Sequence, residues 1–237
     1  MTKGFARALL ISICLLLGGA TAAPGAAAQT DTTPVAPLQL SLGDSWAFGF
    51  GATVPSEGGY VPQLHEALKE DFNCSGAGAD PAKAGCRQLR LRNLSVGGAT
   101  TPSMIQGQFP QALPLLESRN GNRNPRDDVE LVTLHIGGND VTGPIIAACV
   151  GGSTPTCLQV IEAEFAAYRS DLDGALSTLR EATGDDAPIL IGTYDNPIAT
   201  CNLAGIPGAV QLADLVLEGG PGVPQGLHDI MREVAAR

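Results

Sequence analysis

Two hydrophobic patterns alternate along the chain. Short runs of apolar and β-branched residues, bounded by Gly, Asn or Asp, are typical of buried parallel strands. Between them, apolar residues recur at the spacing of one helix face. The strand-like runs cover residues 38–42, 89–94, 129–136 and 188–193. The helical stripes are Val61, Leu64, Leu68 and Phe72, then Ile161, Phe165, Tyr168, Leu172, Leu176 and Leu179, and last Leu227, Ile230, Met231 and Val234.

This alternation predicts an α/β fold in which helices cover both faces of a parallel sheet. Its strands are expected to be joined by right-handed crossovers. The Gly- and Pro-rich stretch 218–226 is predicted to be a surface loop, because apolar periodicity resumes on both sides of it. The last stripe runs almost to Arg237, and no strand-like run follows it.

The start of the chain has the layout of an export signal. Residues 1–28 contain a basic start (Lys3 and Arg7), an apolar run and three alanines at the predicted cleavage site. The apolar run is too short to cross a bilayer, so no stable membrane anchor is expected. Residues 29–37 are polar and contain proline, as a tether does. We therefore expect a secreted protein with one domain at 38–237.

Charge and cysteine content narrow the function. The full chain has a net charge of −10, and loss of the two basic signal residues gives −12 for 209 mature residues. A surface this acidic excludes a nucleic-acid binder, whose phosphate contacts need basic side chains. Five cysteines remain once Cys14 leaves with the signal. In an exported protein, this odd number predicts one cysteine without a partner.

The first candidate for chemistry is Gly43-Asp44-Ser45, directly after the first strand-like run. Parallel α/β sheets bind their ligands at the carboxyl ends of the strands, so Ser45 lies where a nucleophile would be placed. Asp44 precedes it and is better interpreted as a hydrogen-bonding partner behind the serine. The tripeptide alone favours an ordinary turn, because all three residue types are common in turns.

Two further clusters change that interpretation. The second strand-like run is followed by the Gly- and Ser-containing stretch 93–100, and the third by Gly137-Gly138-Asn139-Asp140. Glycine lets a backbone N–H approach a ligand closely, and an asparagine amide adds another donor. Donors directed at one developing negative oxygen form an oxyanion hole, which stabilises the transition state of acyl transfer.

In this order, the three blocks resemble the SGNH (GDSL) hydrolases, secreted esterases and lipases widespread in bacteria. Trp46 stands where the first block of that family has leucine. The resemblance spans about residues 38–237 and implies a three-layer α/β/α, flavodoxin-like fold. It also implies a carboxylic ester hydrolase that acts on a small-molecule or lipid ester without metal or cofactor. Ser45 would be the nucleophile, and Ser45, Gly98 and Asn139 would donate to the oxyanion. The chain resembles most the actinobacterial, disulfide-containing branch.

The chain departs from the family at the histidine base. The family carries Asp-x-x-His near its C-terminus, after a fifth strand, and this sequence has no such motif. His65 is predicted to pack at a helix edge and His135 to be structural, which leaves His228 as the C-terminal candidate for the base. We expect instead a chain truncated before the last strand and helix. The alternative function is then an inactive domain that binds a ligand at most. A flavodoxin-like cofactor module is disfavoured, because no phosphate-binding loop is present.

The cysteines agree with an exported, disulfide-containing protein. Cys74 and Cys86 bracket one short segment, and Cys149 and Cys157 bracket another. Both pairs are predicted to form loop-closing disulfides, since the short spacings of metal sites are absent. Cys201 is left unpaired, and the resemblance implies that its partner would lie near the missing C-terminal motif.

Overall fold

The computed structural model describes residues 36–72, 88–122, 124–150, 152–184, 187–196, 198 and 207–237. The predicted export signal lies outside these residues, as do Cys74, Cys86 and Cys201. The described chain divides into two compact units. We call residues 36–136 and 174–192 the sheet unit and residues 137–173 and 193–237 the helical unit, and each is described by itself.

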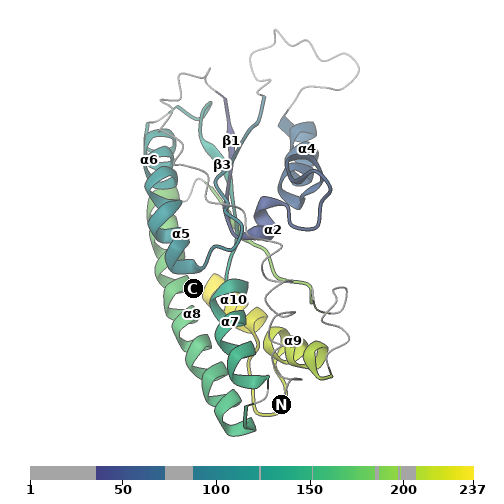
Figure 1. Ribbon diagram of the computed structural model, residues 1–237. Helices are drawn as coiled ribbons and strands as arrows, with labels where there is room; N and C mark the ends of the chain where they lie inside the picture. Colours follow the sequence, from purple (N-terminus) through teal and green to yellow (C-terminus); the bar gives the residue numbers. More distant parts are fainter. Residues whose placement is uncertain are drawn as a thin grey trace. The chain divides into compact units, whose positions relative to one another are not determined.

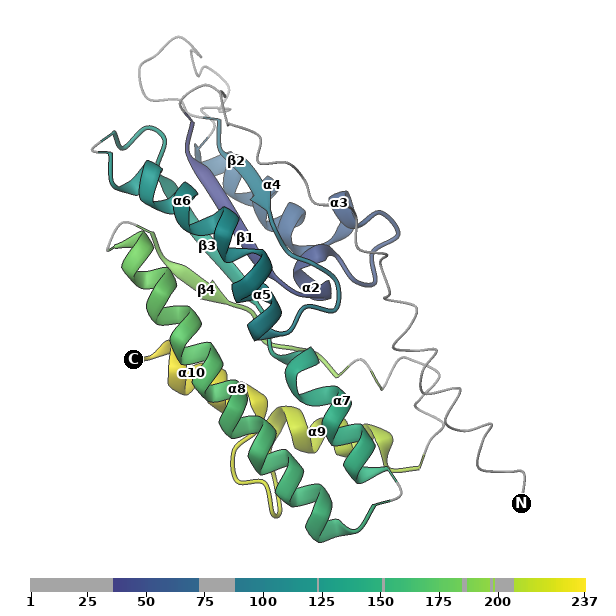
Figure 2. The same cartoon turned by 60° about the vertical axis from the view of Figure 1, so that its left-hand side comes forward.

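Four parallel strands form the sheet unit's centre, and they confirm the predicted α/β fold. Their order is β2-β1-β3-β4, which Figure 2 shows from the side of α6. This is the order of the flavodoxin-like class of open sheets. All four predicted strands are present. They are β1 (Leu38–Gly43), β2 (Arg90–Asn93), β3 (Val129–His135) and β4 (Ile189–Ile191).

Helices cover both faces of this sheet. The elements α2 and α4 lie on one face, and α5 and α6 lie on the other (Figure 1). Only α4 was expected from its apolar stripe. Prolines near the start of α5 and α6, and Pro114 inside α6, interrupt the sequence signal of the two helices on the other face. The bounds are α2 (Ser45–Phe48), α3 (Pro55–Gly58), α4 (Tyr60–Phe72), α5 (Thr101–Gly107) and α6 (Phe109–Asn120).

The two faces of the sheet differ in polarity. On one face, Leu40, Leu42 and Leu134 are fully buried, and burial stabilises each such side chain by about 1.5–3 kcal/mol. The other face, which packs under α4, carries polar side chains that are also buried. These are Gln39, Ser41, Thr133 and His135. The register pairs Ser41 with Thr133 and Gly43 with His135 across β1 and β3. Burial of a polar layer was not expected from the sequence.

The helical unit consists of α7 (Gly138–Cys149), the first part of α8 (Thr154–Thr183), α9 (Ala209–Glu218) and α10 (Leu227–Ala235). The predicted stripes of α8 and α10 are confirmed as helices, whereas α7 and α9 were not predicted. Residues 219–226 join α9 to α10 and form a loop, as expected except for Glu218, which ends α9, and one short bridge links Gly220 and Val223.

The predicted Cys149–Cys157 disulfide is present and joins the end of α7 to the start of α8. Within the described ranges, no helix is both long and apolar enough to cross a membrane.

Candidate active site

Gly43 ends β1 and turns the chain into α2. Its φ of 132° is unfavourable for residues with a side chain, and a Cβ there would collide with the carbonyl oxygen of His135. The buried Gln108 side chain clasps the same residue: its Oε1 accepts from Gly43 N at 2.9 Å, and its Nε2 donates to Gly43 O at 2.8 Å. These contacts fix the turn that precedes Ser45. Sequence reasoning missed Gln108, which lies far away along the chain.

Asp44 is the N-cap of α2. Its Oδ1 accepts from Trp46 N at 2.9 Å, which satisfies a donor that the helix start leaves open. Its backbone N–H donates to His135 O at 2.8 Å. The carboxylate therefore holds the first turn of the helix, and Ser45 follows directly as the first helical residue.

Ser45 is half-buried, and its hydroxyl and backbone N–H make no hydrogen bond within the described part of the chain. Gly98 is exposed, with φ 79° and open space where a Cβ would lie. Its N–H likewise has no partner among the described residues. Two backbone donors of the predicted oxyanion hole are thus available to a ligand.

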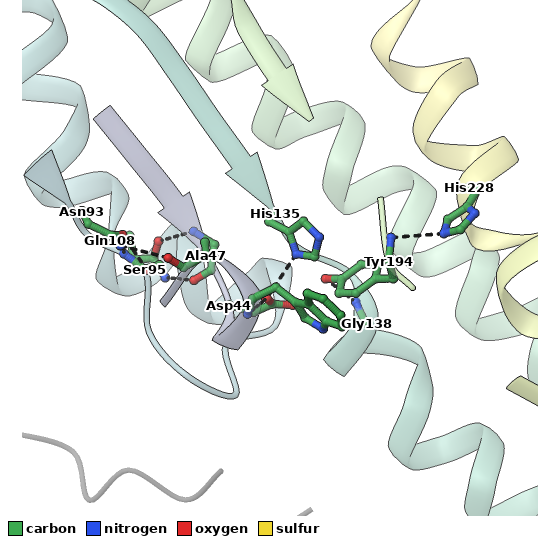
Figure 3. A network of polar contacts seen from close by, with 11 residues as sticks. Asp44, Ala47, Asn93, Ser95, Gln108, His135, Gly138, Tyr194 and His228 are labelled. Atoms are coloured by element: carbon green, nitrogen blue, oxygen red, sulfur yellow. Dashed lines mark hydrogen bonds and ion pairs between the residues drawn. The ribbon is translucent and has the colours of Figure 1, made fainter. Parts of the chain in front are cut away.

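The stretch that carries Gly98 is tied to the stretch that carries Ser45. Val96 N donates to Gly43 O at 3.0 Å, and Asn93 Nδ2 donates to Ala47 O at 2.9 Å. Asn93 Oδ1 in turn accepts from the hydroxyl of Ser95 at 2.5 Å. Figure 3 shows Asn93, Ser95 and Ala47 in this cluster. Hydrogen bonds from Val96 and Asn93 therefore hold the second sequence block against the first.

His135 lies behind Asp44 in the buried polar layer. Its Nδ1 is 3.4 Å from Asp44 Oδ1, and both side chains are buried (Figure 3). The imidazole packs beside the rings of Trp46 and Tyr60, with centroids 5.7 and 5.8 Å away. Gly192 makes room for it, because a Cβ there would collide with the imidazole. These contacts agree with the structural role expected for His135.

Two ionisable groups of the same layer have shifted pKa values. Burial is the main cause that raises the pKa of Tyr60 to about 12. The charge of Asp44 adds to the shift, and the nearby hydroxyls of Thr133 and Ser41 oppose it. Burial also lowers the pKa of His65, whose Nδ1 lies 3.1 Å from Gln39 Oε1. Both groups are held neutral at pH 7. His65 packs inside the layer between α4 and β1 rather than at a helix edge.

The third block begins α7 in the helical unit. Gly137 and Gly138 lie against two tyrosine rings, because a Cβ on Gly137 would collide with Tyr168 and one on Gly138 would lie 2.9 Å from Tyr194 Cε1. Gly138 N donates to Tyr194 Oη at 2.9 Å. Asn139 is the next residue and is half-buried. The glycine pair therefore permits close packing of aromatic rings, a role that sequence reasoning did not assign to it.

His228 also lies in the helical unit, near the start of α10. Its Nε2 accepts from Tyr194 N at 3.2 Å (Figure 3), and its Nδ1 lies 2.9 Å from Glu218 Oε1. Both ring nitrogens thus have partners, and the side chain is buried. The structure places His228 in one network with Tyr194 and Gly138.

Exposed apolar side chains adjoin the first two blocks. Phe48 and Phe50 follow Ser45, Val54 lies a few residues further on, and Val96 precedes Gly98. They have 44–53% of their surface exposed, although residues of these types are more often buried. In the described part of the chain, no group of His, Cys, Asp and Glu has the arrangement of a metal site.

Comparison with known proteins gives a family and a fold. The model of the GDSL-like lipase/acylhydrolase family matches residues 41–237. The lipase Lip_vut3 from a goat rumen metagenome is 16% identical, with a TM-score of 0.53 over 83% of this chain and 73% of that one. The extracellular lipase from Streptomyces rimosus is 17% identical, with a TM-score of 0.50 over 85% and 76%. No curated relative is matched.

At these identities, the two lipases show that the fold is shared. The family match is stronger support, because it spans all three sequence blocks and most of the chain. The protein belongs to the GDSL-like lipase/acylhydrolase family of hydrolases.

Proposed function

We propose that this protein is a secreted serine esterase or lipase that cleaves carboxylic esters through an acyl-enzyme on Ser45. One observation carries the proposal. The hydroxyl and N–H of Ser45 and the N–H of Gly98 have no hydrogen-bond partner in the described chain. A nucleophile and two donors left open at the carboxyl end of parallel strands suit acyl transfer.

In the proposed reaction, a base takes the proton of the Ser45 hydroxyl while Oγ attacks the ester carbonyl carbon. The negative oxygen of the tetrahedral intermediate accepts hydrogen bonds from Ser45 N and Gly98 N, and the family resemblance adds the Asn139 amide as a donor. Collapse of the intermediate breaks the ester C–O bond, and the alcohol leaves with the proton. Water then repeats the sequence on the acyl-enzyme and releases the acid.

The proposed reaction needs a base that accepts the proton of the Ser45 hydroxyl. A base needs a lone pair within hydrogen-bond reach of the serine, and both ring nitrogens of His228 already have partners. This observation favours the second candidate function, an inactive domain that holds an ester or a related ligand without cleaving it. The two functions make opposite predictions for turnover.

The exposed apolar residues beside Ser45 and Gly98 support a substrate with an apolar group. Phe50 lies close to Trp46, with ring centroids 6.0 Å apart, and its N–H donates to Ser45 O at 2.7 Å. A partly exposed aromatic pair next to the proposed nucleophile suits contact with an apolar group of a ligand. We therefore propose small-molecule or lipid esters with an apolar acyl chain.

Export is part of the proposal. It is supported by the signal-like residues 1–28 and by the Cys149–Cys157 disulfide, because disulfides persist mainly in oxidising compartments. The extracellular lipase among the structures of the same fold agrees with this location.

The test is turnover of p-nitrophenyl esters by the full chain, with Ser45→Ala as the decisive variant and Ser56→Ala, on α3, as the matched control. We expect turnover that Ser45→Ala abolishes and Ser56→Ala retains, with faster cleavage of a hexanoate than of an acetate. Turnover that survives Ser45→Ala would refute the proposed nucleophile. No turnover, with an ester analogue still bound, would establish the inactive binding domain.

A further inference from the structure

We infer that Tyr194 is a positioning residue for Asn139, and that His228 acts through Tyr194 rather than as a base. The inference rests on the proposed function, because it assigns these residues to the oxyanion donor Asn139. It uses contacts within the helical unit alone.

The peptide groups around Gly138 are held from two sides. Its N–H donates to Tyr194 Oη at 2.9 Å, and its carbonyl accepts from Thr142 Oγ1 at 2.5 Å. The ring of Tyr194 also lies against the Gly138 Cα, so the backbone cannot move toward it. The carbonyl of Gly138 belongs to the peptide bond that leads into Asn139. Tyr194 therefore sets the orientation in which α7 begins and from which the Asn139 side chain extends.

Tyr194 is held in turn by His228. A backbone N–H can only donate, so the contact of Tyr194 N with Nε2 places the lone pair of His228 on Nε2 and its proton on Nδ1. That proton is directed to Glu218 Oε1 at 2.9 Å. The chain of contacts thus runs from Glu218 at the end of α9, through His228 on α10, to Tyr194 and Gly138. The lone pair that a base would need is engaged by the backbone.

The geometry makes a specific prediction for two substitutions of His228. In His228→Gln, the side-chain amide oxygen can take the place of Nε2 and accept from Tyr194 N. In His228→Phe, no acceptor remains. A positioning role therefore tolerates glutamine and not phenylalanine, whereas a base tolerates neither.

The first experiment is steady-state kinetics with a p-nitrophenyl ester. We expect Tyr194→Phe and His228→Phe each to lower kcat about tenfold with KM unchanged, because an oxyanion donor acts in the transition state. His228→Gln should stay within about threefold of wild type. The double variant Tyr194→Phe/His228→Phe should fall no further than either single one, since both act on one contact chain. A loss in His228→Gln as large as in His228→Phe would overturn the inference.

The second experiment has a readout that does not depend on activity. Hydrogen–deuterium exchange of the peptide containing Gly138 reports whether its N–H is held. Exchange should be faster in Tyr194→Phe and His228→Phe, and unchanged in His228→Gln and in Ser45→Ala. Unchanged exchange in Tyr194→Phe would overturn the inference. A chain without turnover that still shows this pattern would separate failure of the proposed function from failure of the positioning role.

Discussion

The side-chain amide of Gln108 makes two hydrogen bonds to the backbone of Gly43, accepting from its N–H at 2.9 Å and donating to its carbonyl at 2.8 Å. The two residues are 65 positions apart, and both are buried. This clasp links the start of α6 to the turn that presents Ser45. It therefore couples the stability of the fold to the placement of the proposed nucleophile.

Replacement of Gln108 by methionine should lower the stability of the fold and disturb the placement of Ser45. Gln108→Met leaves the buried N–H of Gly43 without its partner, which costs about 1–3 kcal/mol of unfolding free energy. Because the turn before Ser45 loses a restraint, kcat should also fall. The control is Gln111→Met on the exposed side of the same helix, which should change stability by less than about 0.5 kcal/mol. Urea denaturation measures the unfolding free energy of both variants. A Gln108→Met variant as stable as wild type would contradict the clasp.

Two glycines should respond to alanine in opposite directions. At Gly43, the added Cβ would collide with the His135 backbone at a positive φ, so Gly43→Ala should destabilise by about 3 kcal/mol or more. Gly174 lies exposed inside α8 with open space around it. Gly174→Ala should stabilise by about 0.5–1 kcal/mol. Thermal melts of the two variants, read against wild type, would show opposite shifts in Tm.

Acidification should destabilise the fold through His65. Its pKa is lower in the folded chain, chiefly through burial and further through Lys69. The unfolded chain therefore binds the proton first, and the unfolding free energy falls as the pH drops below about 6.5. This contribution is fully present above that pH. Comparing denaturation at about pH 7.5 and about pH 5.5, we expect a smaller loss in His65→Gln than in wild type. Identical losses would show that His65 does not carry this effect.

Alkaline pH should destabilise through Tyr60 by the same linkage with the opposite sign. The pKa of Tyr60 is raised to about 12 in the folded chain, so the unfolded chain ionises first, near pH 10. The contribution is present below about pH 10 and is lost as the pH rises toward 12. The slope of unfolding free energy between about pH 9 and pH 11 should be shallower in Tyr60→Phe. An unchanged slope would contradict the burial of this hydroxyl.

The strands and three of the helices follow from local patterns. Runs such as Val129–His135 are rich in β-branched and apolar residues, and the stripes of α4, α8 and α10 have the period of a helix. Helices α5, α6 and α7 were not predicted because proline lies in their first turns or interiors, at Pro102, Pro114 and Pro144. They form because tertiary packing outweighs weak local preference.

Ser45 and Gly98 can be proposed from the sequence because each depends only on its position after one strand. Ser45 and Gly98 follow strand-like runs, and the open N–H groups found there agree with that placement. The contacts that hold the backbone around these residues could not be predicted from the sequence. Gln108 to Gly43 and Tyr194 to Gly138 join residues 65 and 56 positions apart, and a Gln or Tyr carries no local sign of its distant partner. The buried polar layer was missed for the same reason.

The most direct measurement of the central claim is covalent labelling with a fluorophosphonate, which reacts with activated serines. Mass spectrometry of the labelled full chain should find one phosphonyl group, on the peptide that contains Ser45. Ser45→Ala should remove the label, whereas Ser56→Ala, Tyr194→Phe and His228→Gln should keep it. Absence of label on Ser45 in the wild-type chain, or a label that persists in Ser45→Ala, would contradict the assignment of Ser45 as the nucleophile.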